Sequence, residues 1–198
     1  LSYTRTDDMI TQEPSQDDAT RMQHYTYMNF GRVDNATLSL NLPFTLTSRW
    51  TMNINANGLY RNYRSRFMGS DFRKTALHGY VDFNNRFDWG RGWQMQLNGY
   101  VVTPRWYLAR RSRAYGSMEL SVEKSLWSGR GTLSATLNDP FRWETSHYVL
   151  RYGNIDNDGW AMSDTRYLRI DFSYRFGSDK VKRSRQRRTG AETFNDRL

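Results

Sequence analysis

The sequence has no cysteine and no long apolar stretch, and these absences exclude several kinds of protein. Without cysteine, the chain forms neither a disulfide framework nor a thiolate metal site. No stretch approaches the ~18 uninterrupted apolar residues of a transmembrane helix, and the mean hydropathy is −0.86. The chain starts at Leu1 without a basic or apolar leader, so we expect any export signal, and more of the protein, to lie upstream.

Aromatic residues are abundant despite the low hydropathy. The chain contains 7 Trp, 13 Tyr and 10 Phe. A disordered chain would not carry so many rings, because such chains lack the apolar groups that drive folding. These side chains are therefore expected either to be buried or to lie at an interface.

Apolar and polar residues alternate along most of the chain. Between Leu77 and Phe87 the odd positions are mostly apolar and the even positions are polar. The same alternation recurs over 93–101, 118–122, 133–137 and 168–176. No segment of comparable length keeps a period of 3.6 residues, so the sequence predicts an all-β chain.

Eight strands are predicted, with connections that alternate between short and long. The strands cover residues 1–10, 22–46, 49–63, 72–88, 92–104, 113–127, 131–152 and 164–176. We expect a bulge near Gly31, where Gly31, Asp34 and Asn35 offer a turn as the alternative, and another near Asp139–Pro140. The long connections cover 11–21, 64–71, 105–113 and 153–164. This rhythm is typical of an antiparallel up-and-down transmembrane β-barrel with short periplasmic turns and long outer loops.

The tryptophans lie near strand ends rather than strand centres. Indole rings prefer the boundary between lipid and water, and form a girdle at each rim of a barrel. A soluble β-sandwich or jelly roll also alternates apolar and polar residues, but would place such bulk in its core. The predicted aromatic girdle consists of Trp50, Trp89, Trp93 and Trp127 beside the short turns, and Trp106, Trp143 and Trp160 near the long loops.

The end of the chain resembles a known family. Residues 167–177 (Tyr-Leu-Arg-Ile-Asp-Phe-Ser-Tyr-Arg-Phe-Gly) resemble the closing strand of TonB-dependent outer-membrane receptors, and more closely that of their outer-membrane β-barrel family. In that family a short basic tail often follows. Asn138–Phe141 is similar to an N-D-x-F element of the penultimate strand. Leu1–Ile10 and Asn29-Phe30-Gly31 match a looser upstream pattern.

This resemblance implies a 22-stranded barrel with an N-terminal plug and a box that meets the TonB system. Residues 1–176 would supply about its last eight strands, and 177–198 a basic periplasmic tail. The expected function is the C-terminal barrel wall of a transporter that takes up a scarce or large ligand in a Gram-negative outer membrane. The alternatives are a structural or adhesion barrel without transport, and a soluble β-sandwich binding module.

Three sets of residues are candidates for function. The final strand resembles the signal read by the barrel-assembly machinery, with Phe172, Tyr174 and Phe176; the alternative is an ordinary edge strand. The loop with Arg105, Arg110, Arg111 and Arg113 could hold lipopolysaccharide phosphates or an anionic ligand, or simply anchor the chain at the interface. The candidates for lining the lumen are His78, Asp82, Asn84, Gln94, Gln96, Asn98, Arg169 and Asp171.

Other activities find little support in the sequence. The pI near 9.9 suggests nucleic-acid binding as a possible function. The basic tail, however, has Phe194 as its one aromatic residue, and a solvated tail is favoured over a nucleic-acid or lipid contact. Asn154–Gly159 looks like the start of a calcium loop, but Thr165 occupies the twelfth position, where a Glu is needed. No cofactor and no catalytic site are expected, since His24, His78 and His147 lack ligand spacing.

Overall fold

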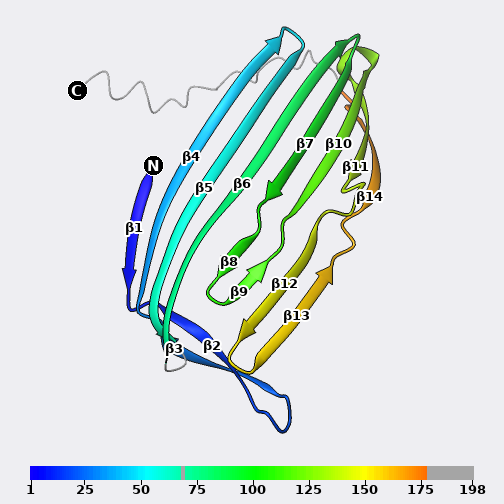
Figure 1. The fold of residues 1–198 in the computed structure, drawn as a ribbon. Coiled ribbons are helices and arrows are strands. Elements are labelled where there is room, and N and C mark those ends of the chain that lie inside the picture. The colour runs from blue at the N-terminus through cyan, green and yellow to red at the C-terminus, as the bar shows by residue number, and fades with distance from the viewer. Residues whose placement is uncertain (68–69, 178–198) are drawn as a thin grey trace, which may run out of the picture.

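The main element of the chain is an eight-stranded antiparallel sheet, curved into an open wall (Figure 1). The computed structural model describes residues 1–67 and 70–177. The strands of this sheet are β1 (Ser2–Asp7), β4 (Arg32–Thr47), β5 (Trp50–Phe67), β6 (Ser70–Gly90), β7 (Trp93–Val102), β10 (Tyr115–Leu126), β11 (Gly131–Asn138) and β14 (Tyr167–Tyr174).

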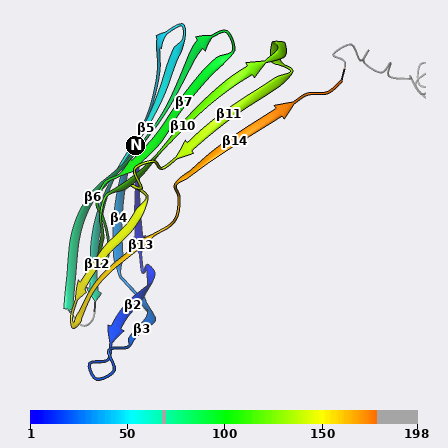
Figure 2. The ribbon, with the colours of Figure 1, turned by 90° about the vertical axis from the view of Figure 1, so that its right-hand side faces the viewer.

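The sheet has the order β1-β4-β5-β6-β7-β10-β11-β14, so each of its strands lies beside the next one along the chain. This confirms the predicted all-β, antiparallel, up-and-down arrangement. The sheet does not close on itself, and β1 and β14 form its two edges (Figure 2). Within the described ranges, no helix is long and apolar enough to cross a membrane.

The two faces of the wall differ in chemistry across its full width. Antiparallel ladder partners project to the same face of a sheet. Asn53, Asn84, Asn98, Glu119 and Asn138 are successive partners across five strands and form a polar row. The neighbouring apolar rows lie on the opposite face, for example Leu40, Ala56, Val81 and Val101. We refer to the polar face as the inner face, since it is the face that lines a transmembrane barrel.

Two smaller sheets lie toward the end opposite the short turns (Figures 1 and 2). One has the order β13-β12-β9-β8 and the other pairs β2 with β3. The bounds are β8 (Arg105–Tyr107), β9 (Arg110–Ser112), β12 (Thr145–Tyr152), β13 (Ile155–Met162), β2 (Ile10–Gln16) and β3 (Gln23–Asn29). One 3-10 turn, η1 (Trp127–Gly129), joins β10 to β11.

The prediction of a single strand over 22–46 is wrong. The segment forms β3 and β4, which belong to different sheets. The chain breaks at Phe30, which is fully buried, and at Gly31, which has a φ of +85°. Only glycine adopts this conformation readily, and a Cβ on Gly31 would meet the Arg64 carbonyl oxygen at 3.0 Å.

The prediction of a single strand over 131–152 is also wrong. Its phase change is not a bulge, because β11 ends at Asn138 and β12 starts at Thr145 in another sheet. Asp139 and Arg142 both adopt positive φ between these strands, at 41° and 54°. The intervening segment turns the chain out of the wall.

The predicted long outer loops are largely hairpins. The 11–21 connection contributes most of β2, and 153–164 contains β13. The 105–113 connection contains β8 and β9. Strands β5 and β6 extend through most of 64–71, and the last ladder pair between them is Phe67 with Ser70. Strands of three residues, such as β8 and β9, are too short for alternation to reveal.

A small apolar cluster lies at the outer end of the inner face. Phe30, Val33, Tyr63 and Leu108 are buried together. Val33 and Tyr63 are ladder partners, and alternation along β4 places Val33 on the same face as Asn41. Since Leu108 belongs to the β8–β9 turn, this cluster fixes the hairpin against the inner face of the wall.

Candidate functional site

The residues predicted to line the lumen lie on the inner face. Asn55 Nδ2 donates to Asp82 Oδ2 over 2.8 Å, and Arg86 Nη2 donates to Gln94 Oε1 over 3.0 Å. The register pairs Arg86 with Gln96, Asn84 with Asn98, Thr136 with Arg169, and Ser134 with Asp171. His78 belongs to the same face farther out along β6, opposite Leu59. The register thus joins these residues into one polar surface.

The tryptophans predicted beside the short turns share one end of the wall. Trp50 stacks on Phe87 with ring centroids 5.0 Å apart, and its Nε1 donates to Asn85 Oδ1 over 3.2 Å. Trp127 contacts the rings of Phe172 and Tyr174. Trp89 and Trp93 are exposed beside the β6–β7 turn.

The tryptophans predicted near the outer loops are dispersed. Trp106 belongs to β8, where the Lys74 ammonium lies 3.6 Å from the centroid of its ring. Trp143 stacks on Phe141 in the β11–β12 connection, with centroids 4.7 Å apart. Trp160 is in β13 and is exposed. The aromatic cluster at the outer end is instead formed by the rings of Phe30, Tyr63, Phe72 and Tyr152.

The β8–β9 hairpin is held by contacts on both sides of its turn. Leu108 and Ala109 are buried, and Leu108 packs against the wall although its φ is +54°. The Tyr63 hydroxyl donates to the Trp106 carbonyl oxygen over 3.5 Å. On its other edge the hairpin pairs with β12 from Ser112 to Arg110. Packing of Leu108 against the wall therefore supports a backbone conformation that leucine rarely adopts.

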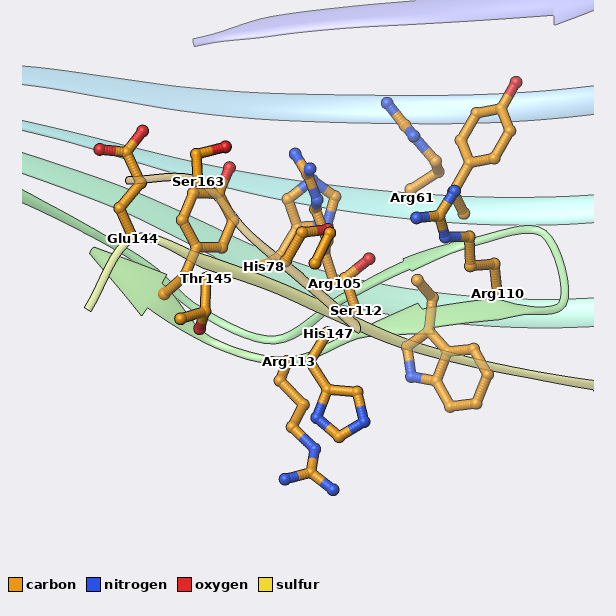
Figure 3. A pocket seen from close by; sticks show the side chains of 15 residues that line it. Arg61, His78, Arg105, Arg110, Ser112, Arg113, Glu144, Thr145, His147 and Ser163 are labelled. Carbon is orange, nitrogen blue, oxygen red and sulfur yellow. The ribbon is translucent and has the colours of Figure 1, made fainter. Parts of the chain in front are cut away.

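A cavity of about 610 Å³ lies between this hairpin, the β12–β13 hairpin and the inner face. The wall contributes Arg61 from β5 and His78 from β6, and the hairpin contributes Arg105, Arg110 and Ser112. Figure 3 shows the side chains of Arg61, His78, Arg105 and Arg110 on one side of the hairpin. This volume is typical of pockets for small organic ligands.

The positive charge in this cavity is not neutralised by neighbouring carboxylates. Among the described residues, no ion pair involves Arg61, Arg105 or Arg110. Arg61 donates from Nε to Asn35 Oδ1 over 2.7 Å and from Nη1 to the Tyr63 hydroxyl over 3.0 Å, both of which are uncharged partners.

The other cationic contacts in the cavity are with aromatic rings. Arg110 lies 3.7 Å from the centroid of the Tyr148 ring, and Arg105 lies 5.7 Å from that of Tyr115. A guanidinium on an aromatic face keeps its N–H groups available at the edge of the ion. The aromatic rings therefore orient Arg105 and Arg110, and no salt bridge among the described residues occupies their N–H groups.

Glu144 is the acidic residue among those that line the cavity. His147 contacts Asp158, with Nε2 and Oδ1 2.5 Å apart. His78 differs, since its Nδ1 is buried and has no hydrogen-bond partner. The cavity thus combines a net positive charge with an unsatisfied ring nitrogen.

The structure separates the four arginines predicted to act together. Arg105, Arg110 and Arg113 line the cavity, as Figure 3 shows, whereas Arg111 lies next to Arg110 in β9 but lines another one. Alternation along β9 accounts for this difference. Arg111 lines a separate cavity beside Leu77 and Thr103 and lies 5.8 Å from the Trp106 ring.

Sequence reasoning missed Arg61 and Glu144 as parts of the site. Arg61 shares its parity along β5 with Asn55, which indicates the inner face but not a partner hairpin. Glu144 lies in the segment interpreted as a strand. Their proximity to Arg105 depends on the hairpin turning back onto the wall.

Asp139 holds the point where the chain leaves β11. Its side chain is 1% exposed, and it accepts hydrogen bonds from Trp143 N (2.9 Å), Glu144 N (3.3 Å) and Thr165 Oγ1 (2.6 Å). Burial opposes ionisation, yet these hydrogen bonds lower the pKa of Asp139 below its ordinary value. Because Thr165 precedes β14, Asp139 joins both ends of the β12–β13 excursion. It is the Asp of the Asn138–Phe141 element.

The proposed assembly residues lie along the last edge of the sheet. Phe172 and Tyr174 belong to β14, and Phe176 follows it with its ring 4.6 Å from Tyr174. All three are exposed. β14 pairs with β11 on one side, and among the described residues no strand pairs with its other side.

Two further sequence features are placed only in part. The basic tail lies outside the described residues from position 178 onward. The segment that looks like the start of a calcium loop enters β13 at Ile155 and pairs with β12. Among the residues that the structure covers, no group of three or more His, Asp or Glu side chains could hold a metal ion.

Comparison with known proteins gives one match. The family model described as the outer membrane protein beta-barrel family matches residues 1–174. Neither a curated protein nor a solved structure matches the chain. The family match confirms the predicted location in the outer membrane of Gram-negative bacteria, and the apolar face of the wall is accordingly its lipid-facing side.

Proposed function

Because the chain belongs to the outer membrane protein beta-barrel family, we propose that it forms the C-terminal wall of a TonB-dependent transporter. The transporter takes up a ligand too large or too scarce for passive pores. Energy coupling to the TonB system requires a plug and a coupling box, which the strands of this chain do not form. The family's membrane location excludes the soluble β-sandwich alternative.

One observation supports transport more than any other: the hairpins at the outer end turn onto a continuous polar inner face. A barrel that served only as a scaffold needs no cavity between its wall and its loops. Here, Leu108 packs against Tyr63, and the hairpin and wall enclose polar space. Ligand capture at the outer end, followed by passage along Asn84 and Asn98, uses both features.

The proposal includes the partners of the wall. Its apolar face contacts outer-membrane lipid and lipopolysaccharide. The barrel-assembly machinery recognises β14, since an unpaired edge strand offers free backbone groups for strand addition.

Growth of a deletion strain tests the transport proposal. Cells that lack the gene are compared with wild-type cells on a panel of limiting nutrients, each in the presence and absence of the TonB system. We expect a growth defect on at least one nutrient, with no additional defect when the TonB system is also removed. A defect confined to adhesion or envelope integrity would overturn transport and support a structural barrel.

A further inference from the structure

We infer that the cavity formed by Arg61, His78, Arg105 and Arg110 binds a soluble organic anion that carries carboxylate or phosphate groups. This inference rests on the proposed transport function, since it names the chemical class of the ligand. It assigns the ligand to the cavity rather than to the basic segment as a whole, because Arg113 also lines this cavity but Arg111 lines a separate one.

The first argument is electrostatic. Among the described residues, four guanidinium groups without ion pairs line one space, those of Arg61, Arg105, Arg110 and Arg113, and the one carboxylate in its lining is that of Glu144. Like charges gathered around a cavity repel one another when nothing lies between them. An anion removes this repulsion and gains charge-assisted hydrogen bonds, for which guanidinium groups have a fixed two-pronged geometry.

The second argument is the unsatisfied nitrogen of His78. Buried polar atoms in folded proteins almost always have a hydrogen-bond partner. His78 Nδ1 is buried without one, and the residue lines the same cavity as Arg61 and Arg105. A ligand oxygen supplies the missing partner when the imidazole ring turns Nδ1 toward the cavity, with the proton on the nitrogen or on a ligand hydroxyl.

The position of the cavity distinguishes a soluble anion from lipopolysaccharide. Arg61 and His78 lie on the face of the wall opposite to Leu40 and Val81, which face lipid. Lipid headgroups surround the outside of the barrel, whereas a soluble anion reaches the inner face from the external medium. The aromatic residues Trp106, Tyr107 and Tyr115 also line the cavity and offer apolar area to the carbon skeleton of the ligand.

Binding is tested with the full-length protein in detergent by isothermal titration calorimetry. The probes are inositol hexakisphosphate and citrate, with a neutral oligosaccharide for comparison and purified lipopolysaccharide in a separate arm. The variants are Arg105→Gln, Arg110→Gln and Arg61→Gln. Arg111→Gln is the matched control, because it removes the same charge from the same hairpin outside the cavity.

We expect at least one polyanion to bind, with each cavity substitution weakening it roughly tenfold, since hydrogen bonds to charged groups contribute about 1.5 kcal/mol or more. Arg111→Gln should leave binding within about twofold, and added salt should weaken it. Equal losses in Arg111→Gln and the cavity variants would overturn the site. If the substitutions weaken only the binding of lipopolysaccharide, the assignment of a soluble ligand to the cavity is overturned. Polyanion binding without TonB-dependent growth would refute transport and leave the site standing.

Discussion

Replacing Leu108 by alanine should release the β8–β9 hairpin from the wall while leaving the barrel assembled. Leu108 is 5% exposed and is buried with Phe30, Val33 and Tyr63. Truncation of a buried leucine to alanine costs about 3 kcal/mol when the surroundings do not collapse. The whole of this loss falls on hairpin docking, because the strands of the wall pair independently of Leu108.

A loss of that size raises the population of the undocked hairpin roughly 100-fold, at about 1.4 kcal/mol per factor of ten. Hydrogen exchange of the backbone amides measures this population, because amides exchange when their segment opens. In the full-length protein in detergent, peptides that cover 105–113 should exchange roughly 100-fold faster in Leu108→Ala, and trypsin should cleave there sooner.

The control is Leu46→Ala, which shortens a half-exposed, lipid-facing leucine at the other end of the wall. It should leave exchange over 105–113 unchanged. An exchange rate in Leu108→Ala equal to that of the wild type would refute the reasoning, since the hairpin would then be held by something other than the cluster. Loss of exchange protection in β4–β7 would refute it as well, because docking would then not be separable from the wall.

Three further outcomes follow from the structure. Asp139→Asn should destabilise the protein by about 2 kcal/mol. Because folding lowers the pKa of Asp139, its stabilisation is present at neutral pH and should be lost as the pH falls from about 4 through the folded pKa. Denaturant unfolding at a series of pH values measures both effects. Gly31→Ala should lower the melting temperature, because its Cβ would meet the Arg64 carbonyl oxygen at a positive φ, with a cost of roughly 1–2 kcal/mol; unchanged melting contradicts this. Deleting Tyr174–Phe176 should keep the full-length protein out of the outer-membrane fraction, and normal insertion of the deletion would disprove the assembly signal.

Alternation predicted the parts of the fold in which one face meets lipid and the other water. Strands such as β6 and β7 repeat this contrast over many residues, so their period is unambiguous. It fails where the chain leaves the wall. Asp139 and Gly31 reverse the chain through positive φ, and their neighbours, such as Phe30 and Glu144, belong to packing that no period encodes.

The candidate site was half visible in the sequence for the same reason. Arg105 and Arg110 attract notice because they are close in sequence, and His78 because it lies on a polar face. Arg61 joins them only when the hairpin packs over it, which depends on contacts such as Leu108 with Tyr63 across more than forty residues. A local sequence pattern does not show which of the four nearby arginines lies outside the cavity.

The strands of the wall extend outward to different lengths, and this difference affects solubility and self-association. β6 continues outward beyond its last ladder partner in β7, so the backbone of 71–78 pairs with β5 on one side only among the described residues. Such a bare edge invites strands from other molecules to pair with it. Arg73 and Lys74 place charge along it, and the ring of Trp106 covers the Lys74 ammonium. The hairpin that encloses the cavity therefore also guards this edge against aggregation.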